Sequence, residues 1–427
     1  MEQQNKQNYL LPIIMMVFLF GMIAFVTNLA APMGKILINQ FGVSNAEGLL
    51  GNLANFIAYA VMGIPGGIML EKLGYKKTAL IAIGVGLAGV FIQYLSGGAG
   101  SFAIYLVGAF VAGFSMCLLN MVVNPMLNTL GGGGNKGNQL IQIGGSFNSV
   151  MGTLTPMLVG VLVGEISKAN ITDVYPVLYI AMGVFAFAFI VIALSKLPEP
   201  HAEKTKEALS SLMLGALKFR HFVLGAFAIF VYVGVEVGTP GILDLWLVKG
   251  VGISTTISGF VCGTYWFLML CGRLIGASIG GKVSSKIMLT ITSGTGLILV
   301  GLAILLPVTT LVNVPVLQTD AVGSLGFGLA EVPINALLLL LVGLCTSIMW
   351  GSIFNLAVEG LGKYLAAASG IFMVLVCGGG ILPWIQGRIA DIGGYQISYI
   401  VIALGLAYLL YYAAIGSKNV NKDIPVD

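Results

Sequence analysis

Glu236 places a negative charge inside the apolar stretch FAIFVYVGVEVG, residues 227–238. If this stretch crosses a membrane, the carboxylate is costly unless it is protonated, paired or beside water, so it is a candidate ion or substrate site. Arg273, in the apolar stretch LMLCGRLIG, is the partner that we expect for it. The alternative interpretation is a structural ion pair that locks two helices together.

Amide side chains recur along two further apolar stretches. Asn120, Asn124 and Asn128 follow each other at a spacing of four, so they share one face of a helix. Gln142 and Asn148 lie in the next stretch, within QIGGSFNSVMG. A single amide in such a helix usually only joins two helices, but a cluster over two successive helices favours a hydrogen-bonding site of the size of a polyol.

Aromatic residues in the second half of the chain complement these amides. Apolar faces of sugar rings stack on aromatic rings, while sugar hydroxyls need amides or acids, so the combination suits a carbohydrate. We predict substrate contacts from the following residues: Asn120, Asn124, Gln142, Asn148, Tyr232, Tyr265, Trp350 and Asn355.

The composition requires a membrane to hold these residues. Hydrophobic residues make up 58% of the 427 residues and charged residues 8%, well below the share in soluble domains. Apolar runs of about 20 residues recur along the whole length, which predicts an all-α bundle of transmembrane helices rather than a β-barrel. The lipid bilayer is therefore an expected partner, and no cleavable signal peptide is expected.

Other functional classes find little support in the sequence. The five cysteines lie in apolar stretches without metal-type spacing, so we expect no metal site and no disulfide framework. The net charge is +4 and no basic run mixes with aromatic residues, so nucleic acid is not an expected partner. His201 and His221 have no catalytic group around them, which argues against an enzyme, and no cofactor is expected.

Twelve spans are predicted, in two halves of six. A charged segment, PEPHAEKTKEALSS, divides the chain into residues 1–197, a cytoplasmic linker at 198–219, and residues 220–427. The predicted spans are 10–31, 49–70, 79–95, 102–127, 138–163, 174–196, 221–246, 256–280, 286–308, 334–358, 365–389 and 395–416.

Lysine and arginine placement predicts the orientation. With the N-terminus inside, 15 of the 20 Lys and Arg residues fall on cytoplasmic segments, so both termini are expected in the cytoplasm. Lys35 is expected near the outer mouth, where it could steer an acidic substrate inward or could be a helix-end residue that reaches for the interface. The long external connection 308–333 is expected to pack over the outer face.

The segment GIMLEKLGYKK, which follows the second span, resembles the loop signature of the major facilitator superfamily. Gly74 is expected to form a tight turn and Glu71 to face a helix N-terminus. The alternative is a solvated, positively charged loop without a gating role. The predicted gating residues are Gly67, Glu71, Lys72, Gly74 and Lys76.

Together the segments resemble one family of that superfamily, the fucose, galactose and glucose proton symporters. The matching pieces are VVNPMLNTLG, GGSFNSVMG, YVGVEVG, GTYWFLMLCGRLIG, TSIMWGSIFNLAVEGLGKY and SGIFMVLVCGGGILPWIQGRIAD. The resemblance implies a twelve-helix fold in the cell inner membrane and a central site reached alternately from each side. It also implies uptake of a sugar driven by a coupling ion, proton or sodium.

Three departures from that family concern the site. The acid that fucose-type members carry late in the first span is replaced by Ala31 or Lys35, depending on the gap. A Glu of the fourth span is Asn120 here, and a Gln of the fifth is Gly145. We therefore keep a neutral sugar, an acidic sugar such as a sialic acid or uronate, and a facilitative uniporter as alternatives, besides a non-transporting sensor of the same fold.

Overall fold

The computed structural model describes residues 9–29, 33, 36–37, 40–42, 50–163, 169–195, 197–199, 209–319, 325–421 and 423–426. The first half of the chain contains α1 (Leu10–Asn28), α4 (Leu50–Ala99), α5 (Phe102–Leu130), α6 (Gly134–Val163) and, after the 3-10 turn η2 (Ile171–Val174), α7 (Tyr175–Leu194). A short helix, α8 (Leu209–Leu217), follows within the predicted linker.

The second half begins with α9 (Arg220–Leu245), which continues into the π-helical turn η3 (Trp246–Val251). The remaining helices, with their short turns, are α10 (Thr255–Ile279), α11 (Ser285–Leu305), α12 (Ile334–Thr346), α13 (Met349–Ala357), η4 (Gly362–Tyr364), α14 (Leu365–Val374), η5 (Leu375–Cys377), α15 (Gly378–Gly393), α16 (Tyr395–Ser398), α17 (Ile400–Tyr411) and η6 (Tyr412–Gly416).

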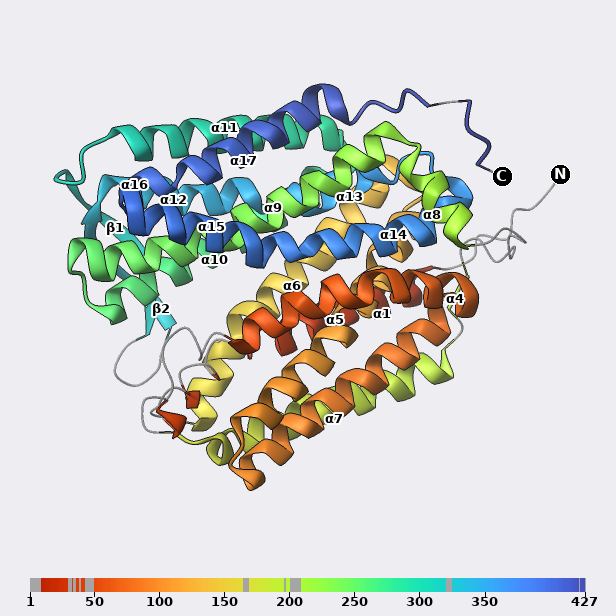
Figure 1. Cartoon of the computed structure of the whole chain (residues 1–427), viewed down its shortest axis with the longest axis horizontal. Helices are drawn as coiled ribbons and strands as arrows, with labels where there is room; N and C mark the ends of the chain where they lie inside the picture. Colours follow the sequence, from red (N-terminus) through yellow and green to blue (C-terminus); the bar gives the residue numbers. More distant parts are fainter. Residues whose placement is uncertain are drawn as a thin grey trace.

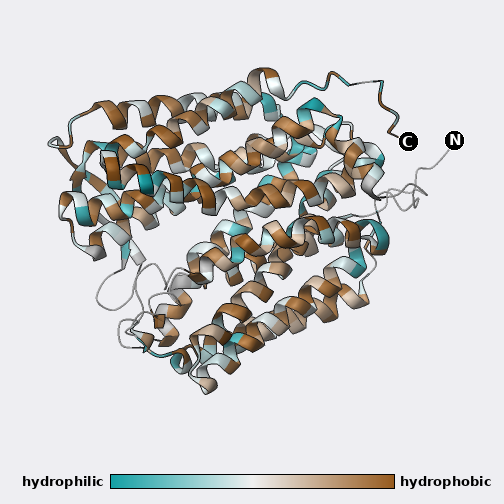
Figure 2. Ribbon diagram, in the orientation of Figure 1, coloured by the Kyte–Doolittle hydropathy of each residue, from teal (hydrophilic) through white to brown (hydrophobic). Residues whose placement is uncertain are grey.

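The helices are long and apolar enough for a membrane protein. In the described part of the chain, ten helices could cross a membrane by length and composition. Gly74 divides α4, one of these ten, into the two predicted spans 49–70 and 79–95, and α6 supplies the predicted span 138–163. The predicted all-α membrane fold is confirmed, and the helices are consistent with twelve spans. Hydrophobic residues recur along the helices of both bundles (Figure 2). Apolar side chains such as Leu194, Ile298 and Leu404 are exposed and require a lipid environment.

The helices form two bundles that lie side by side (Figure 1). One bundle contains α1 and α4–α7, and the other contains α9–α17. α8 and the C-terminal residues lie at one end of the molecule, which we call the tail end, and a β-hairpin lies at the opposite end, the hairpin end. The C-terminal segment is fixed at the tail end because the Arg220 N–H donates to Asn421 Oδ1 at 3.0 Å and the Lys363 N–H to the Val426 carbonyl at 3.0 Å.

The β-hairpin occupies most of the 308–333 connection. Strands β1 (Leu311–Thr319) and β2 (Leu325–Pro333) are antiparallel, with Leu311 opposite Pro333 and Thr319 opposite Leu325. β1 packs beside α10, where the Leu317 N–H donates to the Thr264 hydroxyl at 2.8 Å. These strands were not predicted from the sequence, although the alternating apolar and polar residues of VNVPVLQ are typical of a half-buried strand.

The predicted gating loop forms a turn in the middle of α4. Gly74 has a φ of 80°, which only glycine adopts readily, so the tight turn expected at this position is confirmed. The acid that meets the new helix N-terminus is Glu199, whose carboxylate accepts the Tyr75 N–H at 2.7 Å and the Lys76 N–H at 3.0 Å. The expectation that Glu71 has this role was wrong, because Glu71 lies before the turn, in the helical segment that precedes Gly74.

The other three predicted gating residues also have defined positions. The Lys76 ammonium group donates to the carbonyls of Ala193 and Ser195, at 2.8 and 2.7 Å, and so joins the turn to the end of α7. Gly67 lies against α14, because a Cβ atom on it would be 3.1 Å from the Gly370 Cα atom. Lys72 is exposed.

Candidate functional site

A cavity of about 640 Å³ lies between the two bundles. Its wall on the first half comes from α1, α4, α5 and α6, and its wall on the second half from α9, α10, the α12–α13 region and β1. Its lining includes the following residues: Phe20, Asn28, Asn55, Tyr59, Asn120, Gln142, Gly145, Asn148, Ser149, Glu236, Gly259, Cys262, Trp266, Arg273, Leu317, Ser347 and Trp350. This volume is of the size that a small organic ligand needs.

Glu236 and Arg273 meet in this cavity. The guanidinium Nη2 of Arg273 is 3.4 Å from the Glu236 Oε1 atom, and both side chains are largely buried. The Glu236 carbonyl has no partner within its own helix, because Pro240 has no N–H to give to it. The Tyr265 hydroxyl donates to that carbonyl instead, at 3.3 Å. The ion pair expected from the sequence is therefore present within the second half.

Arg273 also reaches across to the first half. Its Nη1 donates to three oxygens of α6: the Gly145 carbonyl at 3.0 Å, Asn148 Oδ1 at 3.2 Å and the Ser149 hydroxyl at 2.8 Å. Its Nε donates to the Ser347 carbonyl at 3.3 Å. The Arg273 side chain packs directly on α6, since a Cβ atom at position 145 would lie at an ordinary contact distance of 3.5 Å from the Arg273 Cδ atom. The Arg273 guanidinium thus binds α6 of the first half and also binds Glu236 of its own half, which is the only acid among the described cavity residues.

A break between α12 and α13 faces the same cavity. Residues Ser347 and Ile348 form a turn between the two helices, and their carbonyls accept hydrogen bonds from side chains of other helices. The Ile348 carbonyl accepts from Gln142 Nε2 of the first half at 2.9 Å, as the Ser347 carbonyl accepts from Arg273. Non-helical backbone at membrane depth is tolerated where it lines a cavity or is satisfied by other helices, which is the case here.

Hydrogen bonds close the cavity toward the tail end. Asn128 donates to Asn355 Oδ1 at 2.7 Å, and Asn355 donates to the Ser285 hydroxyl at 2.9 Å, which joins α5 to α13 and α11. Gln139 Nε2 donates to the Ala277 carbonyl at 3.0 Å. The backbones approach closely here, since a Cβ atom on Gly370 would lie 2.7 Å from the Gly63 carbonyl oxygen.

Toward the hairpin end the same helices line the cavity. On α10, Cys262 and Trp266 face the cavity, whereas Gly280, nearer the tail end, packs against Gln139 of α6. On α6, Asn148 and Ser149 line the cavity in the same way. The two bundles therefore enclose a cavity that is closed at the tail end and continues toward the hairpin end.

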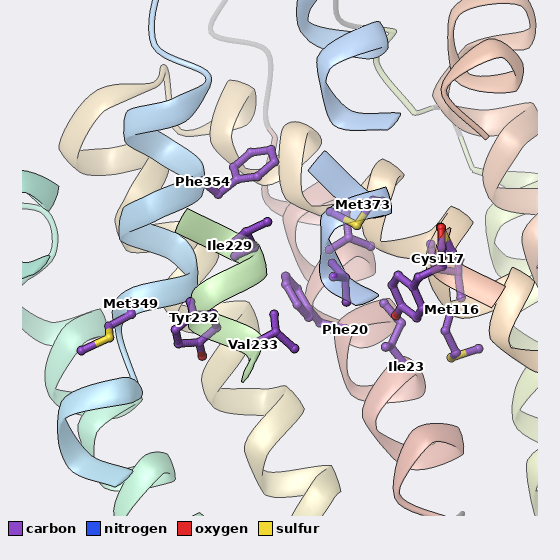
Figure 3. Close-up of a cluster of buried hydrophobic side chains, with 14 of the residues drawn as sticks. Phe20, Ile23, Met116, Cys117, Ile229, Tyr232, Val233, Met349, Phe354 and Met373 are labelled. Atoms are coloured by element: carbon purple, nitrogen blue, oxygen red, sulfur yellow. The ribbon is translucent and has the colours of Figure 1, made fainter. Parts of the chain in front are cut away.

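Buried apolar side chains support this closure. Figure 3 shows Phe20 of α1 close to Val233 of α9, while Ile23 of α1 lies toward Met116 and Cys117 of α5, in a cluster to which Met373 of α14 also belongs. Trp350 is held between Tyr232 and Phe372, with ring centroids 6.3 and 6.1 Å away. The packing fixes the indole so that its N–H points to the first half and donates to Asn124 Oδ1 at 2.9 Å.

The residues predicted for substrate contact fall into two groups. Asn120, Gln142, Asn148 and Trp350 line the cavity. The remaining four are buried around it without appearing among its lining residues: Asn124, Tyr232, Tyr265 and Asn355. Lys35 lies outside the described residues, and the predicted gating residues lie away from the cavity.

Tyr59 is a cavity residue that the predicted set did not include. Tyr59 lies one helical turn after Asn55 on α4, and both line the cavity. This i, i+4 pair of hydrogen-bonding residues in an apolar span was the available signal. Among the described residues, no three His, Cys, Asp or Glu side chains gather as a metal site would require.

Comparison with known proteins gives consistent matches over the chain. The sequence model of the Major Facilitator Superfamily matches residues 13–383. The chain is 28% identical to a glucose/galactose transporter of Brucella abortus over 98% of this chain and 97% of that one. It is 21% identical to the L-fucose-proton symporter of Escherichia coli over 98% and 96%.

Solved structures show the same fold. The Major Facilitator Superfamily transporter FucP, in a structure described as the outward conformation, superposes with a TM-score of 0.81 at 19% identity, covering 96% of this chain and 100% of that chain. The proton:xylose symporter XylE gives a TM-score of 0.67 at 12% identity, covering 96% and 97%. At these identities the likeness concerns the fold alone.

Proposed function

The chain belongs to the Major Facilitator Superfamily, and from this membership we propose that it is a proton-coupled symporter that takes up a neutral sugar by alternating access. The observation that carries the proposal is the cavity between the halves, where amides and an indole lie beside one buried Glu–Arg pair. The relatives whose names state a substrate are transporters of glucose and galactose or of fucose, which are neutral sugars.

The charge of the cavity supports a neutral substrate. Among its described lining residues, Glu236 and Arg273 are the charged ones, and they compensate each other. Arg273 already donates to four oxygens besides Glu236, so little of its hydrogen-bonding capacity is left for a substrate carboxylate. An anion would need an additional cation, and Lys35, which could have been one, lies outside the described residues.

The contacts that join the halves support alternating access. The positively charged loops predict that the tail end faces the cytoplasm, so we assign this conformation to the outward-facing state. Opening the tail end requires the Asn128–Asn355 and Gln139–Ala277 hydrogen bonds to break while the halves close at the hairpin end. These hydrogen bonds lie outside the cavity lining, so they can break and form again without loss of the substrate contacts.

Proton coupling is assigned to Glu236. Its carboxylate is buried beside the cavity, where its counter-charge Arg273 is shared with three oxygens of the other half. A proton on Glu236 removes the attraction within the second half and leaves Arg273 held by α6. Protonation thereby changes the relative strength of contacts within and between the halves, which is what a coupling ion must do to shift a conformational equilibrium.

Transport in proteoliposomes tests the proposal. The purified full-length protein is reconstituted, and uptake of radiolabelled D-glucose, D-galactose and L-fucose is measured under an imposed pH gradient or an imposed sodium gradient. We expect accumulation of at least one of these sugars, driven by the pH gradient. Accumulation driven only by sodium would contradict the proton assignment, and counterflow without any accumulation would indicate a uniporter. Competition by D-glucuronate or N-acetylneuraminate, but by no neutral sugar, would contradict a neutral substrate.

A further inference from the structure

A series of hydrogen bonds with one direction runs along the cavity wall from the second half to the first. Trp350 Nε1 donates to Asn124 Oδ1 at 2.9 Å. Asn124 Nδ2 donates to Asn120, to its carbonyl at 2.8 Å and to its Oδ1 at 3.3 Å. Asn120 Nδ2 donates to the Tyr59 hydroxyl oxygen at 2.8 Å. Each group accepts from the previous one and donates to the next, so the series ends on the Tyr59 phenol.

The end of this series has one donor left. A phenol oxygen can accept a hydrogen bond and donate its own proton, and the Tyr59 oxygen already accepts from Asn120. No acceptor for the Tyr59 hydroxyl proton is found in the part of the chain that the structure describes. Tyr59 lines the cavity although its side chain is largely buried. A polar proton in such a place needs an acceptor, because an unmade hydrogen bond there is costly.

We propose that Tyr59 is a specificity-determining residue that donates a hydrogen bond to one oxygen of the bound sugar. The inference rests on the proposed function and names a contact within that site. A hydrogen bond that the phenol oxygen accepts from Asn120 polarises the O–H group and strengthens its donation to the substrate. Asn120 and Asn124 then act as positioning residues, which fix the direction in which the Tyr59 proton points.

The chemical type of residue 120 decides this direction. An amide nitrogen can only donate, so Asn120 leaves the Tyr59 proton free for the cavity. A carboxylate of the same shape can only accept, so it would draw the Tyr59 proton to itself. Asn120→Asp keeps the acceptor that Asn124 uses but removes the donor, and it should therefore abolish the substrate contact of Tyr59 without removing the tyrosine.

The test uses equilibrium binding of D-glucose, D-galactose or L-fucose, whichever the wild-type protein transports, to the detergent-solubilised full-length protein. The analogues are the monodeoxy and monodeoxyfluoro derivatives of that sugar at each position. Tyr59→Phe should weaken binding of the parent sugar by roughly 3- to 10-fold, as expected for one neutral hydrogen bond. For one monodeoxy analogue the variant should bind as well as the wild type, because that analogue lacks the oxygen that Tyr59 contacts.

The fluoro analogues and the Asn120→Asp variant test whether Tyr59 donates the hydrogen bond to the sugar. Fluorine accepts a hydrogen bond weakly and cannot donate one, so at the contacted position the fluoro analogue should bind wild type better than the deoxy analogue does. This difference should disappear in Tyr59→Phe and in Asn120→Asp. Tyr105→Phe is the matched control, since Tyr105 is also buried in the first half but does not line the cavity, and it should bind every analogue as the wild type does.

Three results would overturn the inference. Tyr59→Phe could bind every analogue with wild-type affinity, which would make Tyr59 structural. It could weaken every analogue by one common factor, which would mean that Tyr59 acts only through Asn120. A fluoro analogue that is no better than its deoxy analogue at every position would exclude donation by Tyr59. Absence of binding of any neutral sugar to the wild type is a different outcome, which contradicts the proposed function itself.

Discussion

Arg273 of α10 donates to the Ser149 hydroxyl of α6 at 2.8 Å, although 124 residues separate them in the chain. The same guanidinium pairs with Glu236 at 3.4 Å within its own half. The bond to the other half is the shorter one, and it comes with two further oxygens of α6. A buried cation that divides its partners between two helical bundles is well placed to respond to a change of charge in either bundle.

The first prediction concerns the charge of Glu236. Glu236→Gln keeps the shape of the side chain but cannot release a proton, so uphill accumulation under a pH gradient should be lost. Counterflow of the same sugar should persist, because the cavity contacts are unchanged. The dependence of uptake rate on external pH should also disappear. If Glu236→Gln accumulates sugar as the wild type does, Glu236 has only a structural role and the coupling group lies elsewhere.

The second prediction concerns the shape of the cation at position 273. Lysine keeps the charge but presents a single ammonium group instead of a planar fork, so it cannot reach Glu236, Ser347 and α6 together. Uptake by Arg273→Lys should fall by at least about tenfold, which corresponds to about 1.4 kcal/mol. Arg388→Lys, at an exposed position of α15, is the control and should transport normally. Normal transport by Arg273→Lys would contradict a role for the planar contact.

The third prediction concerns closure of the tail end. A methyl group at Gly370 would lie 2.7 Å from the Gly63 carbonyl oxygen and 3.0 Å from the Gly67 Cα atom, and backbone cannot move aside as a side chain can. Gly370→Ala should push α14 from α4 at a cost of roughly 1–3 kcal/mol and so favour the conformation that is open at the tail end.

Thiol labelling measures this shift. Cysteine is placed at Gly259, which lines the cavity and has no neighbour within 4 Å of a Cβ atom, in a background that lacks the five natural cysteines. Labelling by a membrane-impermeant reagent from outside should slow in Gly370→Ala. Gly84→Ala, where a methyl group would meet nothing, is the control. Unchanged labelling in a folded Gly370→Ala protein would show that this contact does not hold the tail end closed.

The fourth prediction separates the two acids near the Gly74 turn. Glu199 accepts the N–H groups of Tyr75 and Lys76, so Glu199→Gln loses the charge that faces a helix N-terminus. We expect a loss of roughly 0.5–2 kcal/mol in stability, the range for the loss of an N-terminal cap. Glu71→Gln should lose less. The measurement is the thermal unfolding midpoint of each variant in detergent, and a larger decrease for Glu71→Gln would contradict the assignment of the cap to Glu199.

The sequence by itself determined the class of this protein. Apolar runs of membrane-spanning length and the scarcity of charge leave a helical membrane bundle as the consistent fold, because a backbone in lipid must satisfy its own hydrogen bonds. The same scarcity singled out Glu236 and Arg273, since a charge in an apolar span is conspicuous without any knowledge of its neighbours. The turn at Gly74 was also evident, because turns depend on local residues.

The tertiary structure decided which polar residues face the cavity and which support it. Asn124 and Asn120 share one helix face. Asn120 lines the cavity, whereas Asn124 lies outside the lining and accepts the hydrogen bond of the Trp350 indole N–H. Helical spacing assigns residues to a face and cannot say what packs on each turn of that face. The cap by Glu199 and the contacts of Arg273 with α6 join residues more than 120 positions apart. Such contacts depend on how the helices pack in three dimensions, which local sequence patterns do not specify.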